Sequence, residues 1–180
     1  MGFMGSCPIA GVIWQHLHYI VGLQRLGHDV YYVEDSARLP YNPETFEVGN
    51  EFDYAAQLLD RLAREFEFKN RWSFCARYLP DNPSAGLPLK KVRQLYREAD
   101  AILNICGTQE FNDDLLTSDR ILYIESDPGV EQIKIDQGAG RRSLICAVIT
   151  LSSPLAKMSA RKNSPFLCAA SSGCQRASRS

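Results

Sequence analysis

Apolar residues recur at helical spacing in three segments of the chain. Residues 12–26 follow a period close to 3.6 and end at Gly27, a residue type that commonly terminates helices. Residues 50–66 repeat the pattern, and Asn50 is suited to cap that helix. Residues 88–99 begin with a proline, which fits the first turn of a helix. The pattern therefore predicts three amphipathic helices.

Runs of β-branched and aromatic residues alternate with these helices and predict strands at residues 30–33, 72–78, 101–106 and 121–124. The alternating order places a further, first strand at residues 1–5. The run at 72–78 has a polar residue at every second position, which predicts one wetter face. A buried strand needs about five residues, so the first strand is barely long enough, and the sequence leaves open whether residues upstream of Met1 are missing. The alternation predicts an α/β fold: a Rossmann-like parallel sheet with helices on both faces, followed by an irregular C-terminal tail.

The acidic residues divide the chain into two parts. Residues 1–140 hold all 21 acidic and 13 of the 20 basic side chains. Residues 141–180 hold seven basic residues, nine serines and no acidic residue. We therefore predict a Rossmann-like domain at 1–140, which is long enough to bury a core, and an out-of-frame or disordered tail at 141–180.

Composition argues against several classes of protein. Cys7, Cys75 and Cys106 lie far apart, and no CxxC or Cys/His metal spacing occurs, so we expect neither a bound metal nor a disulfide framework. This favours a reducing, cytoplasmic location. No apolar run of about 20 residues predicts a transmembrane span, and the N-terminus lacks the features of a secretion signal. The basic residues of 1–140 are scattered, so nucleic-acid binding has no support.

Polar residues follow three of the predicted strands. In parallel sheets, ligands bind beyond the carboxyl ends of the strands. The glycine-containing loop 5–11 leads into a helix, where backbone N–H groups can face an anion, although a plain tight turn explains the same residues. Glu34 lies where a ribose-binding acid would be, but no GxGxxG fingerprint precedes it. Gly11, Glu34 and Glu125 are our substrate-binding candidates.

His16 is the catalytic candidate. It lies on the first predicted helix, near the glycine loop, and could act as a general base or bind a substrate hydroxyl. A half-buried or surface histidine is the alternative. His18 lies two residues further on, so the two rings face roughly 200° apart and cannot act as a pair of ligands.

The stretch PIAGVIWQHLHYIVGLQRLGHDVYYVED, residues 8–35, resembles the opening of GT-B glycosyltransferases. In that family a glycine-containing loop precedes a long helix, which ends in a Leu-Gly-His-x-Val turn; here the turn is formed by residues 26–30. The segment IESDPG, residues 124–129, is similar to part of a poorly characterised group of these enzymes. The resemblance covers most of residues 1–137.

The resemblance implies an acceptor-side domain of an enzyme that transfers sugar from a nucleotide-sugar to an acceptor hydroxyl. The nucleotide-sugar is a co-substrate, and no separate cofactor is expected. The family's second, donor-binding domain has no counterpart in the sequence, so we expect the chain alone to be inactive or nearly so. Gly11 and His16 match the loop and the start of the helix by position.

Residues 141–180 suggest a shift of reading frame. Read one frame over, with degenerate bases chosen freely, the codons of residues 153–158 can encode TFGEN and those of 169–180 can encode GFKWLPTRQPVV, both similar to the family. The encoding DNA tests this hypothesis, and the alternative is a genuine basic tail for anionic partners.

Two other functional interpretations stay open: a non-catalytic module that binds a phosphorylated small molecule, and a product that is unstable because apolar surface is exposed.

Overall fold

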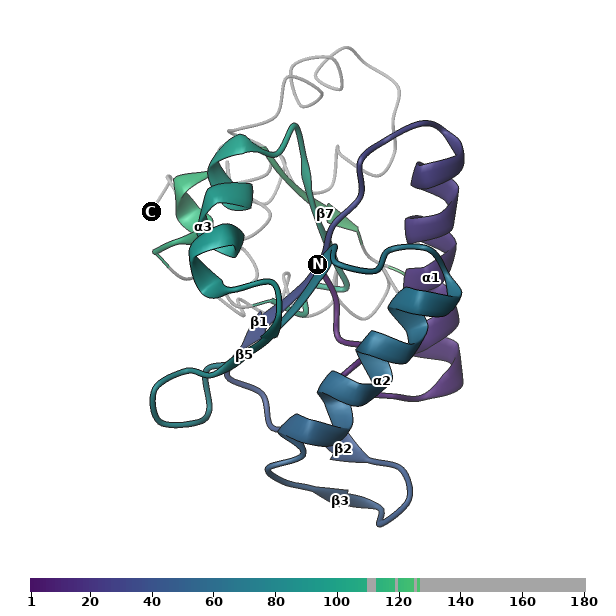
Figure 1. Ribbon diagram of the computed structural model, residues 1–180, viewed down its shortest axis with the longest axis vertical. Coiled ribbons are helices and arrows are strands. Elements are labelled where there is room, and N and C mark those ends of the chain that lie inside the picture. The colour runs from purple at the N-terminus through teal and green to yellow at the C-terminus, as the bar shows by residue number, and fades with distance from the viewer. Residues whose placement is uncertain (110–112, 119, 125, 127–180) are drawn as a thin grey trace, which may run out of the picture. The chain divides into compact units, whose positions relative to one another are not determined.

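The computed structural model describes residues 1–109, 113–118, 120–124 and 126 (Figure 1). The chain divides into two compact units. The first unit comprises residues 1–99 with 107–117, and the second comprises residues 100–106 with 118–180. The sequence also predicts one or two helical turns at residues 128–134; these residues, Glu125 and the whole predicted tail lie outside the described residues.

The first unit carries most of the regular structure. Its elements, in chain order, are α1 (Ala10–Arg25), β1 (Tyr32–Ser36), β2 (Tyr41–Asn42), β3 (Glu47–Val48), α2 (Phe52–Glu65), β4 (Trp72–Ala76), β5 (Ser84–Gly86), α3 (Leu89–Glu98) and the short 3-10 helix η1 (Leu115–Thr117).

The main sheet of the first unit has three strands in the order β1-β4-β5. Strands β1 and β4 are parallel over five residue pairs, from Tyr32 with Trp72 to Ser36 with Ala76. Strand β5 returns antiparallel to β4. It ends at Gly86, where φ is +77° and an added Cβ would lie 2.3 Å from the Trp72 carbonyl oxygen, so only glycine fits this close approach.

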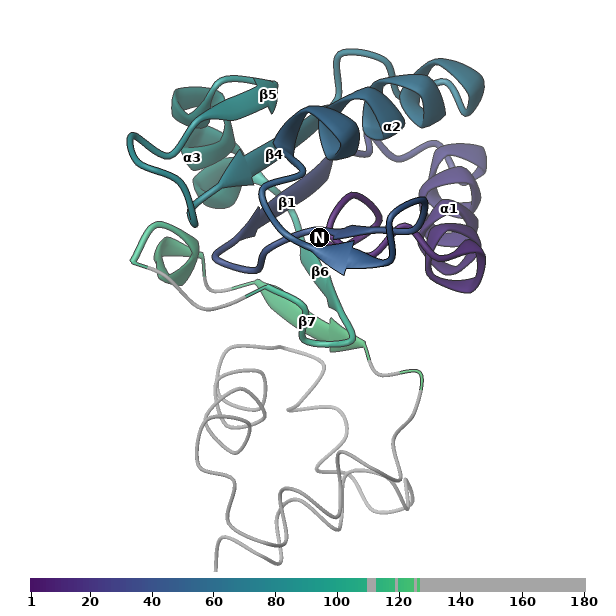
Figure 2. The same ribbon diagram turned by 90° about the horizontal axis from the view of Figure 1, so that it is seen from below.

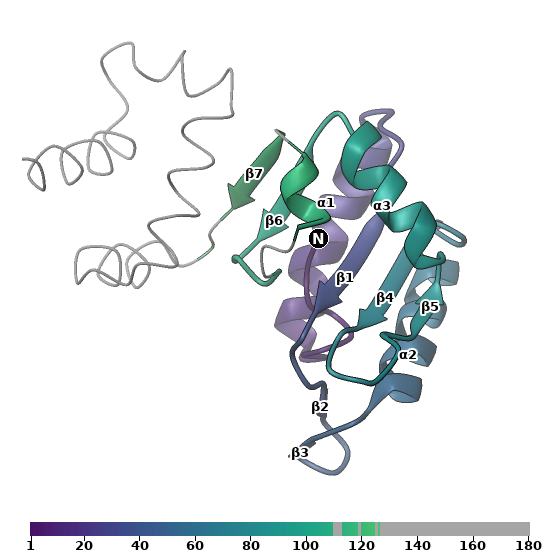
Figure 3. The same cartoon turned by 90° about the vertical axis from the view of Figure 1, so that its left-hand side faces the viewer.

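The two faces of the main sheet are covered by different helices (Figure 3). Side chains alternate along each strand, so Trp72 and Phe74 of β4 pack with α2, while Ser73 and Cys75 point to the other face. On that other face, Tyr96 of α3 bonds β1. All five residues of β4 are buried, so the predicted wetter face of this strand is wrong: α3 covers it.

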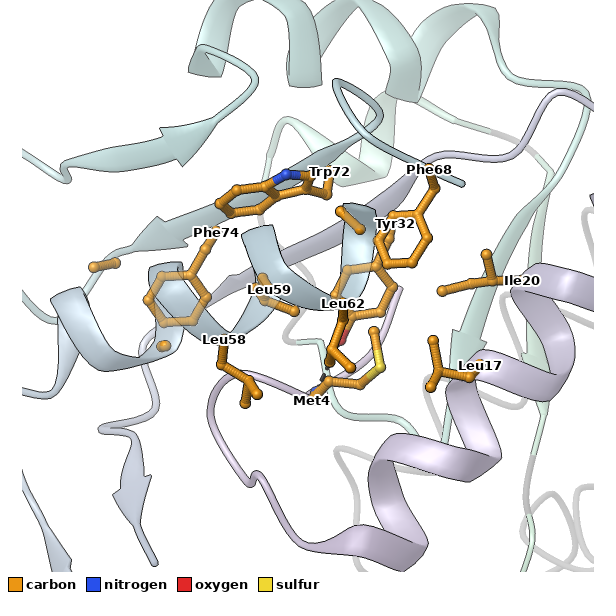
Figure 4. Packing of buried hydrophobic residues seen from close by; sticks show 13 residues of the cluster. Met4, Leu17, Ile20, Tyr32, Leu58, Leu59, Leu62, Phe68, Trp72 and Phe74 are labelled. Atoms are coloured by element: carbon orange, nitrogen blue, oxygen red, sulfur yellow. Dashed lines mark hydrogen bonds between the residues drawn. The ribbon is translucent and has the colours of Figure 1, made fainter. Parts of the chain in front are cut away.

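The hydrophobic core lies between α1, α2 and the main sheet (Figure 4). Helices α1 and α2 lie side by side over one face of the β1–β4 pair (Figure 2). Their apolar stripes meet aromatic residues of the strands and the loop before β4. The labelled core residues are Met4, Leu17, Ile20, Tyr32, Leu58, Leu59, Leu62, Phe68, Trp72 and Phe74.

The three predicted helices are confirmed, with changes at their ends. Gly27 adopts φ +86° after α1, and the His28 N–H donates to the Leu23 carbonyl at 3.1 Å, as expected of a glycine stop. Helix α2 begins one residue later than predicted: Glu51 occupies the cap position and no side chain caps the helix, so Asn50 does not. Helix α3 begins at Leu89, so Pro88 occupies the cap position rather than the predicted first turn.

The strands depart further from the sequence-based prediction. Residues 1–3 have no regular structure and residues 4–6 form a turn, so the predicted first strand is absent from the described sheets. The hairpin β2–β3 and the strand β5 form within residues 38–49 and 80–86, two proline-containing segments that the sequence predicts as loops. The described fold is therefore mixed α/β with small sheets, and its strands do not form one continuous parallel sheet.

The described part of the second unit contains one parallel pair. Strands β6 (Ile102–Ile105) and β7 (Ile121–Ile124) pair from Ile102 with Ile121 to Ile105 with Ile124. Both lie within the segments predicted as strands. In neither unit do the described residues include a helix that is long and apolar enough to cross a membrane.

Candidate functional site

The start of the glycine loop is held by one buried carboxylate, Glu34 of β1. Its Oε1 accepts hydrogen bonds from the Gly5 N–H at 2.5 Å and the Tyr32 hydroxyl at 2.6 Å. Its Oε2 accepts from the backbone N–H and the hydroxyl of Ser6, at 3.0 and 2.8 Å. A side chain at Gly5 would lie only 3.3 Å from Glu34 Oε1, so glycine lets the loop approach this closely.

These contacts give Glu34 a structural task. Burial raises the pKa of Glu34, and the hydrogen bonds from Tyr32 and from residues 5–6 partly offset that rise. The Tyr32 hydroxyl also accepts a bond from the Met4 N–H at 2.8 Å. The carboxylate predicted to bind substrate is therefore occupied by the chain's own N-terminal loop in the described structure.

A side chain from a distant segment joins the N-terminal residues to β1. The Gly2 N–H donates to the Val33 carbonyl at 3.3 Å, as in a parallel strand pair. In such a pair the Asp35 N–H would donate to the Gly2 carbonyl, but here the side-chain amide of Gln109 lies between these two groups. The Asp35 N–H donates to Gln109 Oε1, and Gln109 Nε2 donates to the Gly2 carbonyl, each at 2.6 Å. Gln109 thus lies where direct pairing would occur, which explains why residues 1–5 form no strand.

His16 is buried within the first unit and is 1% exposed. Its Nδ1 lies 2.7 Å from the Val12 carbonyl oxygen, which fits an Nδ1–H tautomer. Phe3 and Tyr32 contact the ring edge-on. Its Nε2 has no hydrogen-bond partner among the described residues, and an added Cβ on Gly2 would lie 2.2 Å from it. The structure therefore places this nitrogen against the N-terminal segment.

Burial lowers the pKa of His16 to about 4. The unfolded chain binds a proton at an ordinary pKa near 6.5, so stability is full above that pH and falls as pH decreases to about 4. We expect the free energy of unfolding to drop by about 2 to 3 kcal/mol over this range through His16 alone. Urea titrations between pH 4 and 7.5 give the free energy of unfolding of the native chain and of His16→Leu. If both proteins lose the same free energy of unfolding as the pH falls, His16 is not the cause of the loss.

Gly11 lies in the exposed first turn of α1. An added Cβ there meets no atom within 4 Å, and Ile9, at the cap position, provides no side-chain cap. The first turn is therefore open to solvent on the side of Gly11. The structure brings Gly5, Ser6 and Glu34 together but leaves Gly11 outside their contacts.

A second polar cluster lies at the carboxyl ends of β1 and β4, on the face covered by α3. Arg77 follows β4 directly and donates hydrogen bonds to Asp35 of β1 through Nε and Nη2, the latter at 2.9 Å. The Tyr96 hydroxyl donates to Asp35 Oδ2 at 2.8 Å. The Asp35 side chain is fully buried and the Arg77 side chain is 26% exposed, so a buried carboxylate orients a cation that reaches solvent.

The cluster continues to a second arginine. Arg93 of α3 donates through Nε to Asp114 Oδ2 at 2.9 Å, and Arg77 Nη2 lies 3.6 Å from the same oxygen. The hydrogen bond from Arg93 lowers the pKa of Asp114, which keeps this carboxyl ionised. Burial raises the pKa of the neighbouring Cys75 thiol to about 11, so this cysteine is not a thiolate nucleophile at neutral pH.

The sequence-based prediction missed this cluster. It placed a polar tip at residues 34–35 and chose Glu34, whereas Asp35 faces the cations. The position of Arg77 near the end of the predicted strand 72–78 was the available signal, because residues at the carboxyl end of a strand lie at the sheet edge where ligands bind. Within the described ranges, no group of three or more His, Cys, Asp or Glu side chains is arranged to hold a metal ion.

Comparison with known proteins adds no assignment, since no family model, curated protein or solved structure matches this chain.

Proposed function

We propose that this chain supplies the acceptor-side domain of a nucleotide-sugar-dependent glycosyltransferase with a Rossmann-like arrangement. The observation that carries the proposal is the parallel pairing of β1 and β4, joined through α2, over five residue pairs. Such a crossover directs the carboxyl ends of both strands to one edge, where ligands bind in α/β folds. The resemblance of residues 8–35 to the family's opening helix supports the same assignment.

The reaction transfers a sugar to an acceptor hydroxyl. The hydroxyl oxygen attacks the anomeric carbon, the bond from that carbon to the diphosphate oxygen breaks, and the bonding pair leaves with the nucleotide diphosphate. A base takes the hydroxyl proton. In this proposal the domain binds and orients the acceptor, which contributes to rate by holding the reacting atoms together.

In this proposal neither His16 nor Glu34 contacts the substrate directly in the described conformation. The neutral ring of His16 has a lone pair on Nε2, but Gly2 lies against that nitrogen, so direct proton abstraction requires the N-terminal segment to move. Glu34 orders the loop from Gly5 onward through its hydrogen bonds. Gly11, in the open first turn of α1, and Glu125 remain proposed substrate contacts. A cytoplasmic location fits the three cysteines of the described residues that form no disulfide, Cys7, Cys75 and Cys106.

Isothermal titration of the chain with neutral methyl glycosides and with the nucleotides UDP and GDP tests the proposal. An acceptor-side domain is expected to bind at least one glycoside about tenfold more tightly than either nucleotide. Micromolar nucleotide binding that is lost in Gly11→Pro would instead support the non-catalytic phosphate-binding module. That variant probes the first turn of α1, because proline has no backbone N–H and so removes a donor that an anion would contact there.

A further inference from the structure

Two arginines converge on one carboxylate at the carboxyl ends of β1 and β4. Asp114 Oδ2 lies 2.9 Å from Arg93 Nε and 3.6 Å from Arg77 Nη2. The two guanidinium groups carry like charge, so they are held together by the anion between them. Asp114 is 29% exposed at its side chain and stands in a short segment that includes η1.

Each guanidinium group keeps donors that the described residues do not use. Arg77 donates to the buried Asp35 through Nε and Nη2, and these two hydrogen bonds fix the plane of the guanidinium group. Its Nη1 makes no hydrogen bond or ion pair with the described part of the chain. Arg93 uses Nε on Asp114, and within the same residues its two Nη groups are without partners. Since a guanidinium has five N–H donors in a rigid fork, a second anion can be accommodated.

We propose that Arg77 and Arg93 form a binding site for an oxyanion, a phosphate or carboxylate group of a ligand, and that Asp114 is the resident counter-ion that such a ligand displaces. Both groups bind guanidinium forks through two parallel hydrogen bonds. The buried Asp35 holds Arg77 in place, while the partly exposed Asp114 is the partner that a ligand would displace. The site lies at the sheet edge where ligands of α/β folds bind.

This inference does not depend on glycosyl transfer. An anion site at Arg77 and Arg93 would serve a phosphorylated ligand, an acidic acceptor or a regulatory anion equally. It is also separate from the first turn of α1, because neither arginine contacts Gly11.

Substitution of Asp114 distinguishes a ligand site from a structural ion-pair network. In a ligand site Asp114→Asn removes a competing negative charge, so phosphate should bind about fivefold more tightly. In a purely structural network the same change only loosens the cluster, and phosphate affinity is unchanged or reduced. Arg93→Gln should weaken phosphate binding about fivefold or more, because a charge-assisted donor is lost.

The measurement is isothermal titration of the full chain with inorganic phosphate, and with acetate as the carboxylate probe, at constant ionic strength set with chloride so that screening is equal. Arg71→Gln is the matched control, since Arg71 forms an exposed pair with Asp29 and should leave both affinities unchanged. Tighter phosphate or acetate binding in Asp114→Asn together with weaker binding in Arg93→Gln supports the site. Should Asp114→Asn fail to fold, the comparison of Arg93→Gln with Arg71→Gln decides. Equal binding by both arginine variants, or no binding of either anion, overturns the inference.

Discussion

Replacement of Arg77 by methionine is expected to lower the free energy of unfolding by about 3 to 5 kcal/mol. Arg77 supplies the positive charge that faces the fully buried Asp35 carboxylate. Without it, the buried carboxylate loses its two-pronged guanidinium partner, and less of the cost of removing the charge from water is offset. Methionine preserves much of the apolar stem, so the loss reports the charge rather than packing.

Urea denaturation of the native chain and the variant at pH 7 measures this loss. Asp35→Asn combined with Arg77→Met should recover part of the stability, because the uncompensated charge is gone. Arg71→Met is the matched control: its partner Asp29 is exposed, so the change should be about 1 kcal/mol or less. If Arg77→Met is as mild as Arg71→Met, the buried pair is not organising the end of the sheet.

Replacement of Gln109 by leucine is expected to cost about 2 to 4 kcal/mol. The leucine keeps similar bulk but leaves the Gly2 carbonyl and the Asp35 N–H without their amide partner. Gln109 is 1% exposed, so water does not readily take over these bonds. Gln94→Leu, on the partly exposed face of α3, should change stability by about 0.5 kcal/mol or less.

Amide hydrogen exchange gives a readout specific to this bridge. In Gln109→Leu the Asp35 amide should exchange faster than in the native chain by more than the global loss of stability accounts for, because its own bond is removed. Unchanged relative protection of Asp35 would mean that Gln109 does not join residues 1–5 to β1.

The helices were predictable because their signals are local. Residues 12–26 and 50–66 repeat apolar residues over several turns, and Gly27 supplies the stop that the structure contains. The cap at Asn50 was wrong by one residue, since nothing local distinguishes it from Glu51 as the last non-helical position.

The strands were less predictable because pairing partners are remote in sequence. Strand β5 has only three residues, Ser84–Gly86, and its pairing is defined by the close approach of Gly86 to Trp72 rather than by an apolar run. Residues 1–5 were predicted as the first strand of the α/β order. A side chain 107 positions away prevents direct pairing, and no local pattern predicts that Gln109 will do so.

The sequence analysis chose Glu34 as a candidate, whereas the structure joins its neighbour Asp35 to a charged cluster. Adjacent residues on a strand point to opposite faces, so Glu34 and Asp35 could not both face one ligand. Sequence alone did not reveal which face was open, because Ser6 and Gly5 turn back to occupy Glu34 and α3 brings Arg93 and Tyr96 to the other face.

Chemical-shift mapping by NMR with neutral methyl glycosides tests most directly whether this domain binds an acceptor at the carboxyl ends of its parallel strands. The predicted result is a set of perturbed amides in residues 5–11, 36–41 and 77–80, which span the start of α1 and the carboxyl ends of β1 and β4. Perturbations confined to residues 26–31 and 68–71, which precede those strands, or none at saturating glycoside, would contradict acceptor binding at this edge.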